Sequence, residues 1–240
     1  MTSLLWTGRA PLALAGEGNW DIDMTDFAER RRLMVESQLR PSAIDNEHVL
    51  EAMGAVPREA FLPPELKGVA YGDEDILLGN GRQLIEPLVL GKLLQAASIK
   101  PTDNVLLLGC TTGYSAAVLS RIAKSVFIVD EDKERLADVE RLLGELGDDR
   151  VVAVHGKPAA GFLSHAPYDV IVIAGAVRQI PEDLKVQLAD GGRLVTVLIS
   201  GRAGKVMVVT KFGSAYGTVT PFDAAAPEVA ALRPAPTFTF

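Results

Sequence analysis

Runs of apolar residues alternate with amphipathic helical segments from residue 101 onward. The first run, NVLLLG at 104–109, has four consecutive large apolar residues, which is typical of a strand buried on both faces of a parallel sheet. Right-handed crossovers join strands that alternate with helices, so the pattern predicts a doubly wound α/β fold with a mostly parallel sheet. The expected parallel strands are 104–109, 125–130, 151–154, 168–175 and 192–199.

The last two strand-like segments, 205–212 and 217–223, are separated only by a short turn. Strands joined so closely pair in an antiparallel manner. We therefore expect an antiparallel pair at one edge of the sheet, and a sheet core over 101–223.

The N-terminal part of the chain has a helical pattern instead. Apolar positions predict a helix over 25–40, which Asp26 can cap and Pro41 ends. Asp45 is expected to cap a second helix that ends before Pro57.

The segment 57–90 is rich in Pro and Gly, and long ordered loops of this kind are usually functional. Pro87 is suited to open the helix that follows it, because proline is tolerated at a first helical position. Met24 precedes a strong helical pattern and is a candidate start of translation. The expected organisation is a loose extension over 1–23 and one domain over 24–240, with a helical part and loop at 24–100.

Composition and charge make several classes of partner and site unexpected. The chain has 240 residues and a formal charge of −7, so nucleic acid and acidic membranes are not expected partners. One cysteine and three scattered histidines give no disulfide and no metal-binding spacing. No apolar run reaches the ~18 residues of a membrane span or resembles a signal peptide, so we expect a cytoplasmic protein. The sequence sets no oligomeric state.

The candidate chemistry lies where the first two strands end. Gly109 permits a tight turn after the first strand, and Gly113 permits close approach of a ligand or a helix. The second strand ends at Asp130, whose carboxylate is placed to accept both hydroxyls of a ribose. Thr111 occupies the usual middle-glycine position of a pyrophosphate loop, which favours S-adenosylmethionine over a dinucleotide. Cys110, without a histidine partner, is interpreted as a small packing residue.

A series of motifs between residues 33 and 200 resembles the protein-L-isoaspartate O-methyltransferase family in order and spacing. The resemblance implies the fold of S-adenosylmethionine-dependent methyltransferases, S-adenosylmethionine as cofactor, no metal, and a protein or peptide substrate methylated on an isoaspartyl carboxylate. The motifs are MVESQL (34–39), VLEAM (49–53), VPREAF (56–61), AYGD (70–73), GNGRQLIEP (79–87), VLLLGCTTGYSAAVLS (105–120), APYDVIVIAGA (166–176) and the segment 180–195.

The chain departs from the family pattern at several functional positions. Where the family typically reads GQTISQP, residues 81–87 read GRQLIEP, so both hydroxyls of that loop are absent. Where it reads EIGTGSGY, residues 107–114 read LLGCTTGY, and where it reads GDG, residues 156–158 read GKP. The resemblance implies catalytic loop positions at Gln83, Ile85 and Glu86, and cofactor-binding positions at Gly109, Cys110, Thr111, Gly113, Tyr114, Asp130, Gly156 and Lys157.

Three functional hypotheses follow. The first is carboxyl methylation of isoaspartyl protein sites, with weak or altered activity because Ile85 cannot hydrogen-bond an acceptor carboxylate. The second is a family member that has lost turnover and acts as a binding or interaction protein. The third, a nicotinamide-dependent oxidoreductase, is disfavoured by Thr111 and by the motif series.

Overall fold

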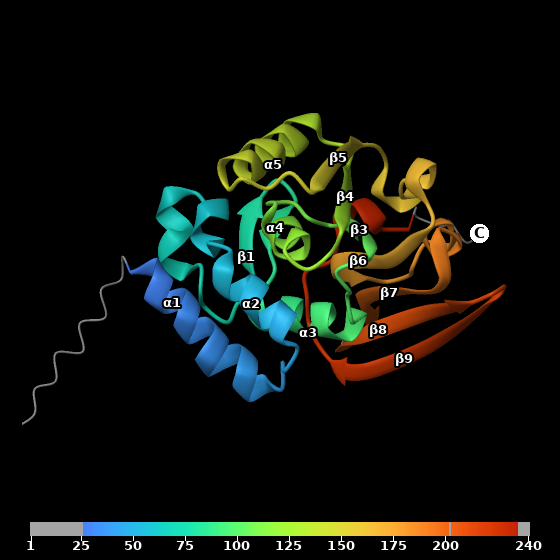
Figure 1. Cartoon of the computed structure of the whole chain (residues 1–240), viewed down its shortest axis with the longest axis horizontal. Coiled ribbons are helices and arrows are strands. Elements are labelled where there is room, and N and C mark those ends of the chain that lie inside the picture. The colour runs from blue at the N-terminus through green and yellow to red at the C-terminus, as the bar shows by residue number, and fades with distance from the viewer. Residues whose placement is uncertain (1–25, 202, 235–240) are drawn as a thin grey trace, which may run out of the picture.

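The computed structural model describes residues 26–201 and 203–234, and its centre is a seven-stranded sheet. The strand order is β5-β4-β3-β6-β7-β8-β9, with parallel neighbours from β5 to β7 (Figure 1). The chain moves outward from β3 through β4 to β5 and then returns to β6 on the other side of β3. This reversal is the switch point of a doubly wound sheet, so the predicted fold class is confirmed. The parallel strands are β3 (Asn104–Leu108), β4 (Ser125–Asp130), β5 (Val151–His155), β6 (Tyr168–Val177) and β7 (Leu188–Ser200).

The last two strands form the antiparallel edge that the sequence predicted. β8 (Ala203–Phe212) pairs with β7, and β9 (Ala215–Asp223) pairs with β8, both in an antiparallel manner. The parallel part of the sheet therefore ends at β7, and the carboxyl ends of β3, β4 and β6 lie at a common edge.

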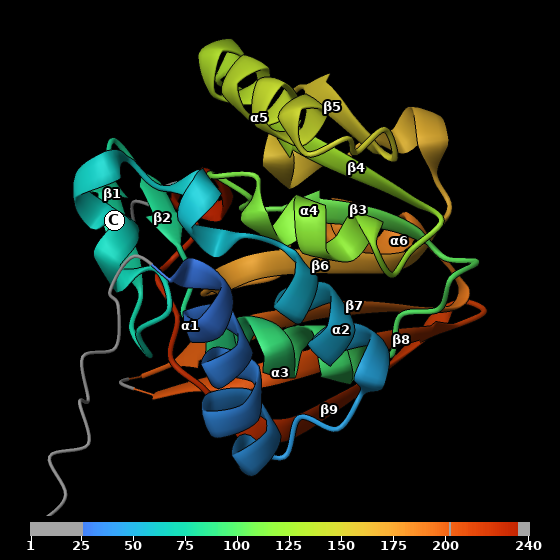
Figure 2. The same ribbon diagram turned by 60° about the vertical axis from the view of Figure 1, so that its left-hand side comes forward.

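Helices cover both faces of the sheet. Side chains alternate along a strand, so Val105 and Leu107 of β3 belong to one core and Leu106 and Leu108 to the other. Helices α2 to α5 supply the first core, and α6 with short 3-10 turns supplies the thinner second core (Figure 2). The helices are α2 (Glu47–Ala55), α3 (Pro87–Ala97), α4 (Tyr114–Ser120), α5 (Lys133–Glu145) and α6 (Glu182–Val186), and the turns are η5 (Pro158–Ala160), η6 (Leu163–His165) and η7 (Ala230–Leu232).

The first predicted helix changes type along its length. It begins as α1 (Phe27–Leu33), where the Asp26 side chain accepts a hydrogen bond from the backbone of Glu29 at 3.0 Å. It continues as a π-helix, η1 (Met34–Leu39), and ends in a 3-10 turn, η2 (Arg40–Ser42), that contains Pro41. The expected extension 1–23 lies outside the described residues.

The predicted cap of the second helix was wrong by one residue. Asn46, not Asp45, caps α2, and its side chain accepts from the backbone of Val49 at 3.3 Å. Asp and Asn are equally good caps, so local preference does not choose between them. Gln95 of α3 anchors this segment, because its Oε1 accepts from the backbone N–H groups of both Asp45 and Asn46 at 2.8 and 3.1 Å.

The segment 57–90, which the sequence predicted as an ordered loop, contains regular structure. Two 3-10 helices, η3 (Arg58–Phe61) and η4 (Pro64–Val69), precede a hairpin of β1 (Ile76–Gly79) and β2 (Arg82–Leu84). Asn80 and Gly81 form its turn with φ of 50° and 71°. Two successive positive φ values are the requirement of a type I′ hairpin turn, for which Asn-Gly is preferred.

Candidate functional site

A cavity of about 160 Å³ lies at the carboxyl ends of β3 and β4. This is the edge at which doubly wound sheets bind ligands. The turn after β3, the end of β4, the β1–β2 hairpin and the segment after β9 all contribute to its wall. The lining residues are Asn80, Gly81, Gln83, Gly109, Thr111, Asp130, Glu131, Arg135, Pro158, Glu228, Val229, Ala230 and Ala231.

Glycine is required at two positions of the turn after β3, for different reasons. Gly109 has φ of 76°, and a Cβ there would lie 3.0 Å from Val229 and 3.3 Å from the carbonyl oxygen of Ala174. Gly113 has φ of 94°, and a Cβ there would meet Val139 and Phe61 at 3.2 and 3.3 Å. Gly109 lines the cavity, where Val229 fills the space that a Cβ would need, whereas Gly113 lies off the cavity, where core side chains fill that space.

Asp130 presents its carboxylate to the cavity from the end of β4. Its Oδ1 accepts from the backbone N–H of Asp132 at 2.8 Å, and its Oδ2 accepts from Nη1 of Arg135 at 3.0 Å. The Asp130 side chain is 14% exposed and that of Arg135 19%. A carboxylate offers about four acceptor sites, so two remain for further donors.

The hairpin brings Gln83 to the same cavity. A Cβ added to Gly175 of β6 would lie 3.3 Å from Nε2 of Gln83, so the Gln83 carboxamide lies beside this glycine. Arg82, the residue before it, lines another cavity together with Phe61 and Leu142. Side chains of neighbouring strand residues point to opposite faces, which explains the difference.

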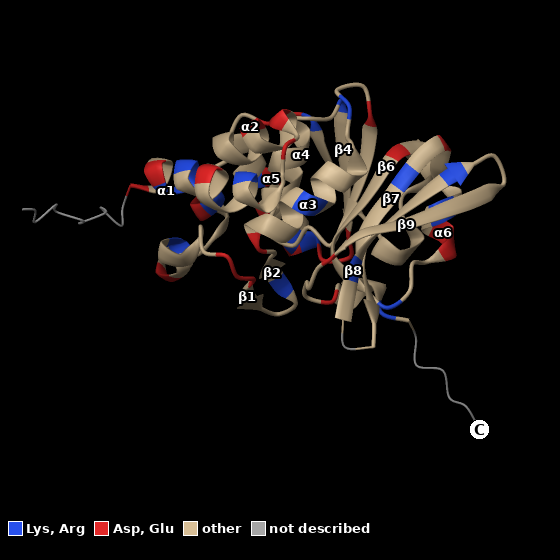
Figure 3. Cartoon of the chain, turned by 90° about the horizontal axis from the view of Figure 1, so that it is seen from below, with Lys and Arg blue, Asp and Glu red and all other residues tan. Residues whose placement is uncertain are grey.

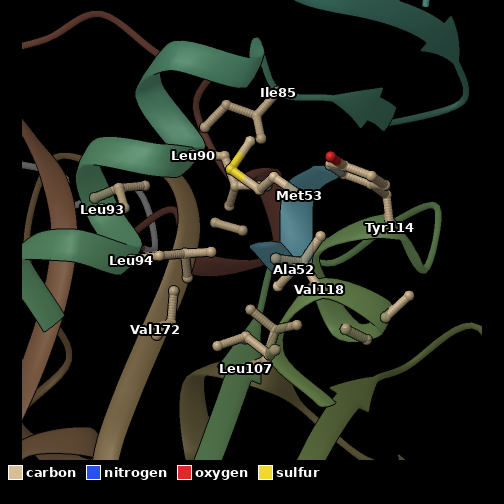
Figure 4. Close-up of a cluster of buried hydrophobic side chains, with 14 of the residues drawn as sticks. Ala52, Met53, Ile85, Leu90, Leu93, Leu94, Leu107, Tyr114, Val118 and Val172 are labelled. Atoms are coloured by element: carbon tan, nitrogen blue, oxygen red, sulfur yellow. The ribbon is translucent and has the colours of Figure 1, made fainter. Parts of the chain in front are cut away.

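The other two predicted catalytic positions lie off this cavity. Ile85 is 3% exposed and packs in the core beside Leu90 and Met53 (Figure 4). The backbone N–H of Glu86 donates to Oδ1 of Asp75 at 2.8 Å. Burial raises the pKa of Glu86, and the neighbouring Asp75 and Asp73 raise it further.

Five of the eight predicted cofactor-binding residues do not line the cavity: Gly113, described above, and four more. Tyr114 is fully buried, and its ring lies 4.9 Å from the guanidinium carbon of Arg58. Cys110 packs against the first core, and burial raises the pKa of its thiol to about 11. Gly156 donates its N–H to the carbonyl of Asp130 at 3.0 Å, and Lys157 is exposed beside Pro158.

The structure adds cavity residues that sequence reasoning missed. Arg135 follows Asp130 by five residues, so the first turn of α5 brings it back to the carboxylate. That spacing was a usable signal. The segment 228–231 reaches the cavity because the backbones of Pro227 and Val229 hydrogen-bond to Ala176 at 2.8 Å. No local sequence pattern predicts this contact.

No cluster of three or more His, Cys, Asp or Glu suited to a metal ion occurs within residues 26–201 and 203–234. In the same part of the chain, no helix combines the length and apolar character needed to cross a bilayer.

Comparisons with known proteins identify the family. The model of the protein-L-isoaspartate(D-aspartate) O-methyltransferase family matches residues 29–222. A protein-L-isoaspartate O-methyltransferase of Koribacter versatilis is 37% identical over 189 residues, covering 79% of this chain and 85% of the relative. One from Methylorubrum extorquens is 40% identical over 177 residues, covering 71% and 74%.

Solved structures agree on the fold. A protein-L-isoaspartate O-methyltransferase superposes with a TM-score of 0.73 at 23% identity, covering 85% of this chain and 67% of that one. A Plasmodium falciparum protein described as a putative enzyme of the same kind, in complex with S-adenosyl-L-homocysteine, gives 0.72 at 16% identity, covering 84% and 98%. By family model and sequence identity, the chain belongs to the protein-L-isoaspartate O-methyltransferase family.

Proposed function

We propose that this protein transfers a methyl group from S-adenosylmethionine to the side-chain carboxylate of L-isoaspartyl residues in proteins or peptides. One observation carries the proposal: Gly109, Asp130 and Gln83 line a single cavity. The first two stand at the usual place of an adenosine ligand, and the third comes from the hairpin that corresponds to the acceptor loop of the family.

The residues present fit the adenosine end of the cofactor. Asp130 keeps free acceptor sites for the ribose hydroxyls, and Gly109 brings the backbone of the turn to the cavity wall without a side chain. Thr111 and Pro158 complete the wall on this side. Of the remaining predicted cofactor positions, Gly113 and Tyr114 shape the turn by packing.

The chemistry demands little of the protein. The bound cofactor supplies an electrophilic methyl group on a sulfonium. An acceptor carboxylate with a pKa near ~4 is ionised at neutral pH, so no general base is required. Most of the acceleration then comes from orientation. The Gln83 carboxamide is placed to donate a hydrogen bond to the acceptor.

Activity is proposed to be weaker than the family pattern implies. The two hydroxyls of the family loop are replaced by Gln83 and Ile85, and the Ile85 side chain is in the core. A carboxamide on a longer side chain has more rotamers to restrict than a threonine hydroxyl, so the acceptor is held less firmly.

A protein or peptide is the proposed partner. Basic and acidic segments are interspersed in the view of Figure 3. Within the Arg30–Arg32 cluster, Arg31 lies 3.7 Å from a Glu59 oxygen, and Arg32 binds Glu29 at 2.6 Å. Arg31 and Arg32 are thus paired with acidic residues within the fold, which supports a partner other than nucleic acid.

The test uses two peptides of identical sequence, one with L-isoaspartate and one with L-aspartate, and S-adenosylmethionine labelled in its methyl group. We expect base-labile label in the isoaspartyl peptide alone. Equal labelling of both peptides, or of neither, would contradict the proposal.

A second candidate, a binding protein without turnover, is favoured by the size of the cavity. Its volume of about 160 Å³ is below the ~300 Å³ at which cofactor pockets usually begin. Calorimetry with S-adenosylhomocysteine separates the two candidates. Measurable binding supports the methyltransferase, and the absence of heat at every temperature tried supports the second candidate.

A further inference from the structure

The hydroxyl of Thr111 makes two hydrogen bonds to one residue of the hairpin. Its Oγ1 accepts from the backbone N–H of Gln83 and donates to the carbonyl oxygen of Gln83, each at 2.8 Å. Thr111 belongs to the turn after β3, and Gln83 belongs to β2. The pair therefore joins the two parts of the proposed site through a single side chain that is 8% exposed.

Both positions differ from the family motifs that the sequence resembles. Aligned with GQTISQP, position 83 has lost a threonine hydroxyl. Aligned with EIGTGSGY, position 111 has gained one where the family has glycine. In this chain, the hydroxyl between the turn and the hairpin belongs to Thr111 of the turn. It hydrogen-bonds to the backbone of Gln83, the hairpin residue at the family's threonine position.

Neighbouring hairpin residues are held from other directions. Nη2 of Arg58 donates to the carbonyl oxygen of Ile85 at 2.5 Å, and Asp75 accepts from the backbone of Glu86 at 2.8 Å. Arg58 also stacks on Tyr114 at the start of α4, but neither of these hydrogen bonds involves Gln83. Thr111 thus supplies a side-chain link between Gln83 and the turn after β3, and it fixes the main chain from which the Gln83 carboxamide reaches Gly175.

We propose that Thr111 is a positioning residue for the acceptor: its hydroxyl locks the β1–β2 hairpin onto the turn after β3 and so orients the Gln83 carboxamide. The inference rests on the proposed function for the identity of the acceptor. A displacement of about 1 Å at a reacting centre costs as much as ~100-fold in rate, so a lock of this kind has a measurable kinetic effect.

The test compares Thr111→Val, which keeps the shape without the hydroxyl, with Thr111→Ser, which keeps the hydroxyl. For Thr111→Val we expect kcat/KM for the isoaspartyl peptide to fall about tenfold or more. The loss of affinity for S-adenosylhomocysteine should be smaller than the loss in kcat/KM, because Val keeps the shape that Thr111 gives the cavity wall and only the hydroxyl bonded to Gln83 is removed. Thr111→Ser should recover most of the loss in kcat/KM. Equal losses in the two variants, or a matching loss of S-adenosylhomocysteine affinity, would overturn the positioning role.

Hydrogen exchange tests the lock without any turnover. The hairpin peptide 77–86 should exchange faster in Thr111→Val than in the unaltered protein, and Thr111→Ser should restore slow exchange. Thr112→Val, which removes a buried hydroxyl one residue away, serves as the matched control and should leave the hairpin protected. Unchanged exchange in Thr111→Val would refute the lock but would leave the proposed function standing. Normal protection combined with no methylation by the unaltered protein refutes the proposed function and the positioning role with it.

Discussion

Val229 packs directly on Gly109, so that a Cβ added to the glycine would lie 3.0 Å from Cγ2 of the valine. Val229 comes from the segment after β9, beyond the residues 29–222 that match the family model. It is held there by the hydrogen bond from its N–H to the carbonyl oxygen of Ala176 at 2.8 Å. This contact makes the C-terminal segment a wall of the proposed cofactor site and keeps the cavity small.

Shortening Val229 should therefore ease entry of the cofactor product. For Val229→Ala we expect S-adenosylhomocysteine to associate at least about threefold faster in surface plasmon resonance, because entry needs a cavity larger than about 160 Å³. Val219→Ala, a valine that is 61% exposed on β9, is the matched control. Identical association rates for both variants would show that Val229 does not limit the entry of S-adenosylhomocysteine.

Asp130 should carry much of the cofactor affinity. Asp130→Ala removes a charge-assisted hydrogen bond to the ribose, which should weaken S-adenosylhomocysteine binding by ~1.5–3 kcal/mol in calorimetry. The nearby Asp132→Asn is the control, because Asn caps α5 as well as Asp and residue 132 does not line the cavity. If the two variants bind alike, Asp130 is not part of the site.

The Ile85 side chain should contribute to the stability of the fold and not to contact with the acceptor. Ile85→Ser empties a core position and buries a hydroxyl, so the free energy of unfolding in urea should fall by ~2–5 kcal/mol. Leu77→Ser, at a position in the same hairpin that is 70% exposed, should change it by no more than ~0.5 kcal/mol. A neutral Ile85→Ser together with a raised methylation rate would show that this side chain faces the acceptor instead.

Glu86 should give stability a dependence on pH. Its pKa is raised in the fold, so the ionised carboxylate opposes folding. This cost is fully present above the folded pKa and disappears below the unfolded pKa of about 4.3. Glu86→Gln should raise Tm at pH 7, and the gain should vanish towards pH 4. Glu51→Gln on the exposed face of α2 controls for the loss of one surface charge. A gain that stays constant with pH would contradict this reading.

Local patterns in the sequence predicted the sheet well. The apolar run at 104–109 indicated burial on both faces, and β3 does lie between two cores. The cap at Asn46 was missed because Asp and Asn are equally good caps, so the local sequence does not choose between neighbouring Asp45 and Asn46. The hairpin was read as a loop although Asn80-Gly81 is a strong turn signal.

The site was predictable where each residue follows directly from a strand. Gly109 and Asp130 end the first two strands of the sheet, and the topology brings those ends together. The direction of Gln83 and Ile85 was not predictable, since the register of a three-residue strand is set by its partner β1. The contacts of Val229 and Thr111 join segments far apart in the chain, and composition gives no sign of them.

In the proposed function, acceptor and cofactor meet in the cavity that Gln83, Gly109 and Asp130 line. The most direct test is a single-turnover measurement with protein in excess over the isoaspartyl peptide and with methyl-labelled S-adenosylmethionine. The unaltered protein should form the methyl ester. Gln83→Ala should be at least about tenfold slower, a loss of ~1.4 kcal/mol of transition-state stabilisation. Arg82→Ala, whose side chain faces the other way, should differ from the unaltered protein by less than about threefold. No ester under these conditions, or equal rates for Gln83→Ala and Arg82→Ala, would contradict the account.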